Sequence, residues 1–110
     1  MAHRSIVARI ANSRNYAENY QFASNTARSP LYQSSYQIGL GRTAIIEAAM
    51  SKLHISESWI QSCEDALQIH GGYGYMTEYE IERELRDALG SRLYSGTNEI
   101  QRNVIASLLL

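Results

Sequence analysis

The fold depends most on residues 42–69, RTAIIEAAMSKLHISESWIQSCEDALQI, because apolar residues recur there at every third or fourth position. This spacing places them on one face of an α-helix, with Trp59 beside it. The stripe runs through Ile45, Ala49, Lys52 with Leu53, Ser56, Ile60, Cys63 and Leu67. His70, Gly71 and Gly72 follow, and glycine supplies the left-handed backbone conformation that ends a helix. The stretch therefore predicts the core helix of the domain.

A second helix is predicted before this stretch, from Ala2 to about Ser24. Its apolar positions follow the same three-to-four spacing and include Ile6, Ile10, Ala17 and Tyr20. Residues 24–35 come next and are rich in residues that favour turns, namely Asn25, Thr26, Ser29 and Pro30. This segment is therefore predicted to be a flexible connection.

Two shorter helices are predicted after the core helix. Thr77 and Glu80 form a capping box, which indicates a helix from there to about Leu89 that ends at Gly90. Thr97 is suited to cap a last helix, whose inward face should carry Ile100, Val104, Ile105, Leu108 and Leu109. No segment shows the alternating pattern of a strand. The predicted fold is an all-α, up-and-down bundle of about four helices.

Composition excludes several classes of function. The 110-residue chain has a net charge of −1 and a pI near 6.3, so no overall positive field attracts nucleic acid or an anionic membrane. No run approaches the ~20 apolar residues of a membrane span. Cys63 is the only cysteine, so we expect neither an internal disulfide nor a metal site built on cysteines. These features predict one domain, residues 1–110, located in the cytoplasm or an organellar matrix.

Two glycine-containing corners are candidates for a functional site. The first, residues 68–75 (QIHGGYGY), has three glycines in four residues, which let backbone approach a ligand closely. A helix end and a turn explain the same glycines, and His70 suits a capping or packing role as well as that of a base. The second corner is Ser95-Gly96-Thr97, where the start of a helix offers free N–H groups to an anion, although ordinary capping explains it too. No third group completes a catalytic triad with Ser95 and a histidine.

Both corners belong to an ordered set of motifs. The set comprises Ala49-Met50-Ser51-Lys52-Leu53, Gln68-x-x-Gly71-Gly72-x-Gly74-Tyr75-x-x-Glu78, Arg83-x-x-Arg86-Asp87 and Leu93-Tyr94-Ser95-Gly96-Thr97-Asn98-Glu99-Ile100-Gln101-Arg102. Over about residues 44–110 it resembles the C-terminal domain of the acyl-CoA dehydrogenase family, flavin enzymes that desaturate acyl thioesters. The resemblance implies FAD as the cofactor and a helical bundle as the fold.

The resemblance also implies roles for single residues. Gln68, Gly71 and Gly72 match the corner on which the adenosine-diphosphate end of FAD from a neighbouring subunit rests, and Thr97 and Glu99 match a second FAD contact region. Tyr94 and Gly96 match positions that face the substrate. Ser95 occupies the place of a glutamate that removes the substrate α-proton in many members, and a serine hydroxyl is too weak a base to replace it without activation. We therefore expect no catalytic residue in this chain.

Size limits what the chain does alone, because the family's enzymes are several times longer and contain two further domains. The leading hypothesis is a C-terminal domain or small subunit that adds FAD contacts and an oligomer interface to the α,β-desaturation of an acyl thioester, on CoA or on a carrier protein. The alternative is a non-enzymatic oligomerisation or regulatory module derived from the family. The expected partners are further copies of the chain or a larger flavin-bearing dehydrogenase chain, because a short bundle leaves the apolar side of residues 42–69 partly uncovered.

Overall fold

The computed structural model describes the backbone of residues 2–110 and the side chains of residues 15–16, 18–19 and 21–110. The chain forms four α-helices, α1 (Ala2–Gly39), α2 (Ile45–His70), α3 (Ile81–Gly90) and α4 (Asn98–Leu109). Two short 3₁₀ helices, η1 (Gly71–Tyr75) and η2 (Thr77–Tyr79), join α2 to α3. Residues 2–110 contain no strand, so the prediction of an all-α bundle of about four helices is confirmed.

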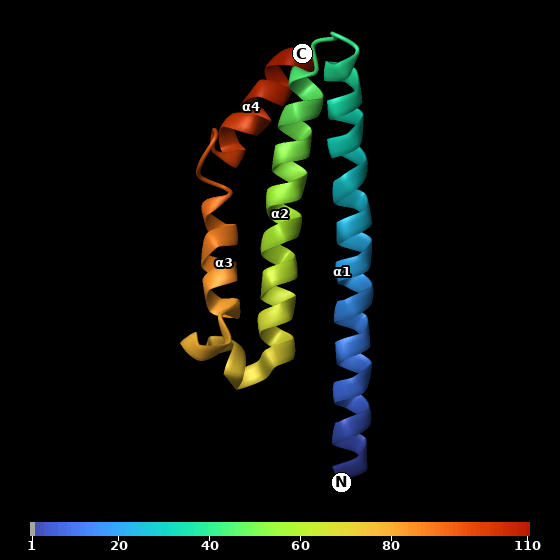
Figure 1. Ribbon diagram of the computed structural model, residues 1–110, viewed down its shortest axis with the longest axis vertical. Coiled ribbons are helices and arrows are strands. Elements are labelled where there is room, and N and C mark those ends of the chain that lie inside the picture. The colour runs from blue at the N-terminus through green and yellow to red at the C-terminus, as the bar shows by residue number, and fades with distance from the viewer. Residues whose placement is uncertain (1) are drawn as a thin grey trace.

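Helix α2 is the centre of the molecule. It runs antiparallel to α1 on one side, while α3 and α4 together return along its other side (Figure 1). The buried core is small and consists of Ile60 and Cys63 from α2 and Ala88 from α3, with Leu85 packed against them. Helices α1, α3 and α4 each pack against α2. The positions of the loops between the helices are therefore set relative to α2.

The core helix has the predicted course, with small differences at its start. It begins at Ile45 rather than near Arg42, because Gly41 (φ +73°) makes a turn after α1. Ala49, Ser56, Ile60 and Cys63 of the predicted stripe are buried, but Ile45 is 54% exposed. The helix ends as predicted at Gly71, whose φ of +63° is in the left-handed region and whose N–H donates to the Gln68 carbonyl.

The predicted connection at residues 24–35 is wrong, because this segment is the middle of the continuous helix α1. Its hydroxyl groups donate to carbonyls one turn earlier, from Thr26 to Phe22 (3.0 Å), from Ser34 to Pro30 (2.8 Å) and from Ser35 to Leu31 (2.9 Å). Packing on α2 holds the segment further, since the Ser34 and Ser51 hydroxyls lie 2.9 Å apart in a buried contact. The predicted face of Ile6, Ile10, Ala17 and Tyr20 lies outside the described side chains.

Two predictions about the later helices also need correction. Thr77 makes no capping hydrogen bond and lies in η2, and α3 begins at Ile81 after Glu80, whose backbone is left-handed (φ 61°). The ring contact between Tyr73 and Tyr79, with centroids 5.2 Å apart, folds η2 back against η1. In α4, Thr97 is the N-cap as predicted, but the expected inward face is only partly correct. Val104 and Ile105 are half-buried, whereas Ile100, Leu108 and Leu109 are exposed.

Candidate functional site

The first glycine corner lies at the C-terminal end of α2. Gln68, Gly71 and Gly72 are all exposed there, and His70 donates from Nδ1 to the Ala66 carbonyl (2.8 Å), which is a capping role. A Cβ at Gly74 would lie 2.5 Å from the Leu67 carbonyl oxygen, so this glycine is required by packing on α2. A Cβ at Gly72 would have nothing within 4 Å. None of the described residues thus requires a glycine at 72, and its backbone is open to approach from outside.

The second corner, residues 93–97, turns the chain from α3 into α4. Ser95 (φ 56°) and Gly96 (φ 81°) are both left-handed, which is a strained conformation for a serine. Tyr94 is 56% exposed, and Thr97 accepts from the Ile100 N–H at Oγ1 (3.3 Å). Glu99 is exposed and lies 3.8 Å from Arg102. None of the described residues accepts a hydrogen bond from the backbone N–H of Ser95, Gly96 or Thr97.

A polar cluster holds this corner to α2. Lys52, the only lysine of the sequence, donates from Nζ to the Gly96 carbonyl (3.0 Å) and to Asn98 Oδ1 (2.7 Å). Asn98 is 1% exposed, and its Nδ2 donates to Ser56 Oγ and to Glu57 Oε1, both at 2.9 Å. Each polar atom of the buried amide is therefore satisfied, as a buried amide requires.

The cluster continues into an ion pair at the start of the corner. Arg92 donates to Glu57 through Nε (3.1 Å, Oε1) and Nη2 (2.6 Å, Oε2), a bidentate arrangement. The hydrogen bonds from Arg92 hold the pKa of Glu57 below its ordinary value of 4.5, against the opposing effect of desolvation. The Asn98 N–H in turn donates to the Arg92 carbonyl (3.0 Å). Both ends of the corner are thus tied to each other and to α2.

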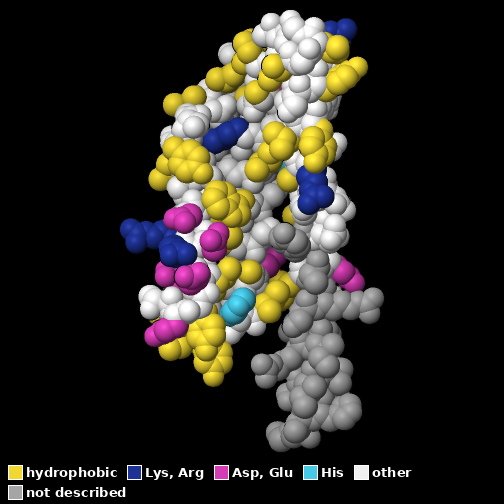
Figure 2. Space-filling model, viewed as in Figure 1, with side chains coloured by type: hydrophobic (Ala, Val, Ile, Leu, Met, Phe, Trp, Pro, Cys, Tyr) yellow, Lys and Arg dark blue, Asp and Glu magenta, His cyan; other side chains and the backbone are white. Residues whose placement is uncertain are grey.

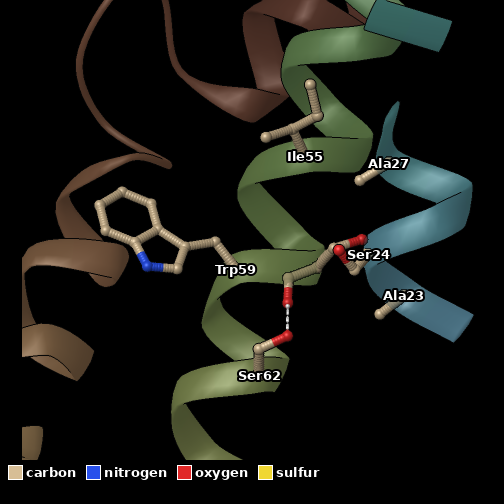
Figure 3. A pocket seen from close by; sticks show the side chains of 7 residues that line it. Ala23, Ser24, Ala27, Ile55, Trp59 and Ser62 are labelled. Atoms are coloured by element: carbon tan, nitrogen blue, oxygen red, sulfur yellow. Dashed lines mark hydrogen bonds between the residues drawn. The ribbon is translucent and has the colours of Figure 1, made fainter. Parts of the chain in front are cut away.

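Two apolar hollows flank Trp59 on α2. One, of about 230 Å³, is lined by Lys52, Ile55, Ser56, Trp59, Ser91 and Tyr94, and so reaches the second corner. The other, of about 170 Å³, lies between α1 and α2, and Figure 3 shows Ala23, Ser24 and Ala27 of α1 facing the α2 side chains across it. The first hollow is open to solvent and is lined in part by Tyr94, which the family resemblance predicts to face the substrate.

The structure does not bring all the predicted site residues together. Tyr94, Gly96, Thr97 and Glu99 share the second corner, but Gln68, Gly71 and Gly72 lie at the other end of α3, a helix of 10 residues and about 15 Å (Figure 1). The predicted site residues therefore form two separate groups in one chain. Among residues 15–16, 18–19 and 21–110, no group of three or more His, Cys, Asp or Glu side chains is arranged to hold a metal ion.

Sequence reasoning missed the polar cluster, which consists of Lys52, Ser56, Glu57, Arg92 and Asn98. A signal was present, because Lys52 and Ser56 interrupt the apolar stripe at i and i+4. Polar residues on a buried face require partners, and here the partners come from the second corner. Cys63, on the same helix, belongs to the apolar core rather than to this cluster, and burial raises the pKa of its thiol.

The whole length of the fold matches one protein family. A family model described as acyl-CoA dehydrogenase, C-terminal domain, matches residues 3–110. The chain belongs to the acyl-CoA dehydrogenase family. Its C-terminal helical domain is the part represented here, as the motifs of both corners indicate.

Individual proteins resemble the chain over most of its length. The chain is 47% identical over 92 residues to the 3-(aryl)acrylate reductase of Clostridium sporogenes, which covers 84% of this chain and 24% of that protein. The crystal structure of the prolyl acyl carrier protein oxidase AnaB superposes with a TM-score of 0.85 and 46% identity, over 88% of this chain and 26% of AnaB. An FAD complex of PigA superposes with a TM-score of 0.83 and 36% identity, over 88% and 25%. The chain thus spans about a quarter of the length of these relatives.

Proposed function

We propose that this chain acts as the C-terminal domain, or a small subunit, of an acyl-CoA dehydrogenase-type flavoprotein that desaturates an acyl thioester between its α- and β-carbons. It contributes FAD contacts and subunit interface, and its partners are further copies or a larger flavin-bearing chain. The observation that carries the proposal is the second corner, where a polar cluster around the buried Asn98 fixes a strained backbone. Tyr94 stays exposed there, and the N–H groups of residues 95–97 have no acceptor among the described residues. A strained loop held by several side-chain hydrogen bonds is expected where a ligand must be placed accurately.

The residues present suit FAD at both corners. At the first, the open backbone at Gly72 lets a pyrophosphate approach without steric hindrance, and the exposed Gln68 side chain can donate and accept hydrogen bonds. At the second, Thr97 and Glu99 open α4, and Gly96 lets the chain pass close to a bound group. Since the two regions are separated by α3, we propose that they serve different FAD molecules of one assembly. When bound, FAD supplies the acceptor for the hydride that leaves the substrate β-carbon.

Ser95 supplies no base for α-proton removal. Its side chain is exposed, and none of the described residues near it is placed to deprotonate it. The proposal therefore assigns the base to another part of the assembly. The substrate is an acyl thioester, and the similarity to AnaB, an acyl carrier protein oxidase by name, makes a carrier-bound thioester a candidate equal to a CoA ester.

Isolation of the assembly tests this function. The chain is tagged in its own cells, purified, and examined by native mass spectrometry for total mass and bound FAD. Dye reduction is then assayed with a series of acyl-CoAs and with acyl carrier protein thioesters. A flavin-bearing assembly that reduces dye with a thioester supports the proposal. A flavin-free assembly that reduces no dye contradicts it, and supports the alternative of an oligomerisation or regulatory module, for which Ser95 is the argument.

A substitution at the first corner tests its FAD contact separately. Gly72→Val places a branched side chain on the open backbone and should lower FAD affinity of the assembly by about tenfold or more, the loss of a charge-assisted hydrogen bond. Gly39→Val is the matched control, because a Cβ there also meets nothing within 4 Å and Gly39 lies at the far end of α1. Equal FAD affinity in the two variants would remove the first corner from the site.

A further inference from the structure

The polar cluster has a geometry that stability alone does not require. Burial of the Asn98 amide, even when its hydrogen bonds are satisfied, and a partly exposed ion pair such as Glu57–Arg92 each add little net stability. Yet Lys52, Ser56 and Glu57 lie within six residues of α2, and each hydrogen-bonds to Asn98. The cluster is therefore better explained by the part of the chain that it holds in place.

The polar cluster holds the second corner, which it contacts at three points. Glu57 fixes the start of the corner through Arg92, Lys52 fixes its middle through the Gly96 carbonyl, and Asn98 fixes its end. Gln101 adds hydrogen bonds from Nε2 to the Ser95 (3.1 Å) and Gly96 (3.4 Å) carbonyls. The corner's carbonyls are therefore drawn toward α2 and α4, whereas Tyr94 and the Ser95 side chain remain exposed.

We infer that Lys52 and Asn98 are positioning residues, which hold the Tyr94–Thr97 corner in its left-handed conformation and so set where it meets FAD and the acyl thioester. That the corner meets FAD and an acyl thioester rests on the proposed function, whereas the role of Lys52 and Asn98 in fixing its conformation does not. Lys52 is the central member, because among the residues with described side chains it alone donates to both the Gly96 carbonyl and the Asn98 side chain. Without it, the middle of the corner loses its link to α2.

Hydrogen exchange followed by mass spectrometry tests the geometry in the purified assembly that contains the chain. Lys52→Met keeps the aliphatic stem and removes the donor. It should raise the exchange rate of the hydrogen-bonded amides of the corner, those of Leu93, Tyr94 and Asn98, about 10-fold to 100-fold, as expected for the loss of hydrogen bonds to a charged group. Lys52→Arg, which keeps the cation, should return exchange toward the wild-type rate. Arg42→Met is the matched control, because it removes an exposed cation from the α1–α2 turn. Unchanged exchange at residues 92–98 in Lys52→Met would overturn the inference.

The FAD dissociation constant of the same variants tests the functional half. We expect a rise of about 10-fold in Lys52→Met, partial recovery in Lys52→Arg and no change in Arg42→Met, a pattern that general loss of stability would not produce. Ser56→Ala removes the two hydrogen bonds between Ser56 Oγ and the Asn98 side chain but leaves both Lys52 contacts, and it should shift both readouts in the same direction. A loosened corner with unchanged FAD affinity would contradict the positioning role. A wild-type assembly without flavin would overturn the proposed function instead, and the exchange rates alone would then decide whether Lys52 holds the corner.

Discussion

Gly72 and Gly74 lie two residues apart and have opposite surroundings. A Cβ at position 74 would press against the Leu67 carbonyl, and rigid backbone cannot move away cheaply. We expect Gly74→Ala to lower the free energy of unfolding by about 1–3 kcal/mol through overpacking. Gly72→Ala, in open space, should change it by no more than about 0.5 kcal/mol. Urea unfolding followed by circular dichroism measures both, and equal losses would show that the packing around Gly74 is misjudged.

Glu57 makes stability depend on pH. Because its pKa in the folded chain is lowered below 4.5, chiefly by hydrogen bonds from Arg92, the carboxylate stabilises the fold above that pH. The contribution is lost as the pH falls through the lowered pKa. The pair is partly exposed (37% for Glu57 and 43% for Arg92), so solvent screening keeps its effect modest.

The Glu57→Gln variant isolates this effect. Its melting temperature should be below that of the wild type at pH 6, and the difference should shrink as the pH is lowered below 4.5 toward 3. Thermal melts of both proteins at half-unit steps of pH give the comparison. A difference that is constant over this range would mean that the Arg92 pair does not distinguish the charged from the neutral carboxyl.

At the scale of elements, α1 shows how packing overrides local composition. Residues 24–35 contain a proline and several residues that favour turns, yet they form helix along the whole contact with α2. Hydroxyl groups that would favour a turn in isolation bond instead to carbonyls one turn back, and Ser34 also reaches Ser51 on α2. The helix keeps a local weakness at Pro30, which has no N–H to donate.

Replacement of this proline should therefore stabilise the chain. Pro30→Ala restores a backbone donor and removes the ring from a helix interior, and we expect a gain of about 1–3 kcal/mol, reduced by the greater freedom of the unfolded chain. Chemical denaturation and the helical signal at 222 nm report the change. A loss of stability would indicate that the proline ring makes a packing contact worth more than the missing hydrogen bond.

Local sequence signals predict some of the helices of this fold and not others. The α2 and α4 helices were predictable because their ends carry strong local signals, Gly71 with positive φ and Thr97 as a capping hydroxyl. The start of α3 was not, because the contact between Tyr73 and Tyr79 displaces the capping box. The corners could be found as glycine motifs, but the cluster around Asn98 joins residues more than 40 positions apart, and periodicity carries no information on such pairs.

At the scale of the whole molecule, the chain exposes more surface than a compact protein of its mass. Its accessible area is 8181 Å², whereas a compact 12.4 kDa monomer exposes about 6,000 Å². The molecule measures 60 × 25 × 24 Å, and Figure 2 shows apolar side chains over much of one face, with acidic side chains gathered over α3. Large exposed residues such as Phe22 (73%) and Tyr36 (66%) lie on α1. The excess area is similar to that of a specific protein interface.

We therefore expect this surface to be covered by another chain or by further copies. Light scattering coupled to size-exclusion chromatography should give a mass above 12.4 kDa that rises with concentration in the micromolar range. Phe22→Glu places a charge on the exposed apolar surface of α1 and should lower this mass. Glu78→Gln removes a charge from an exposed residue of η2 and should leave the mass unchanged. A constant monomer mass would contradict the expectation. None of the described helices has a segment with the length and hydropathy needed to cross a membrane.

The single lysine also has a consequence for proteolysis. An endoproteinase specific for lysine can cut this sequence at one bond only, Lys52–Leu53, inside the N-terminal third of the central helix α2. A protease needs extended backbone, so cleavage requires α2 to unwind, and the other helices lose their common support when it does. The rate of that single cut therefore follows the population of the globally open chain. A gel with two fragments would measure the stability of the whole bundle, and ligands or partners that close the corner over Lys52 would register as protection.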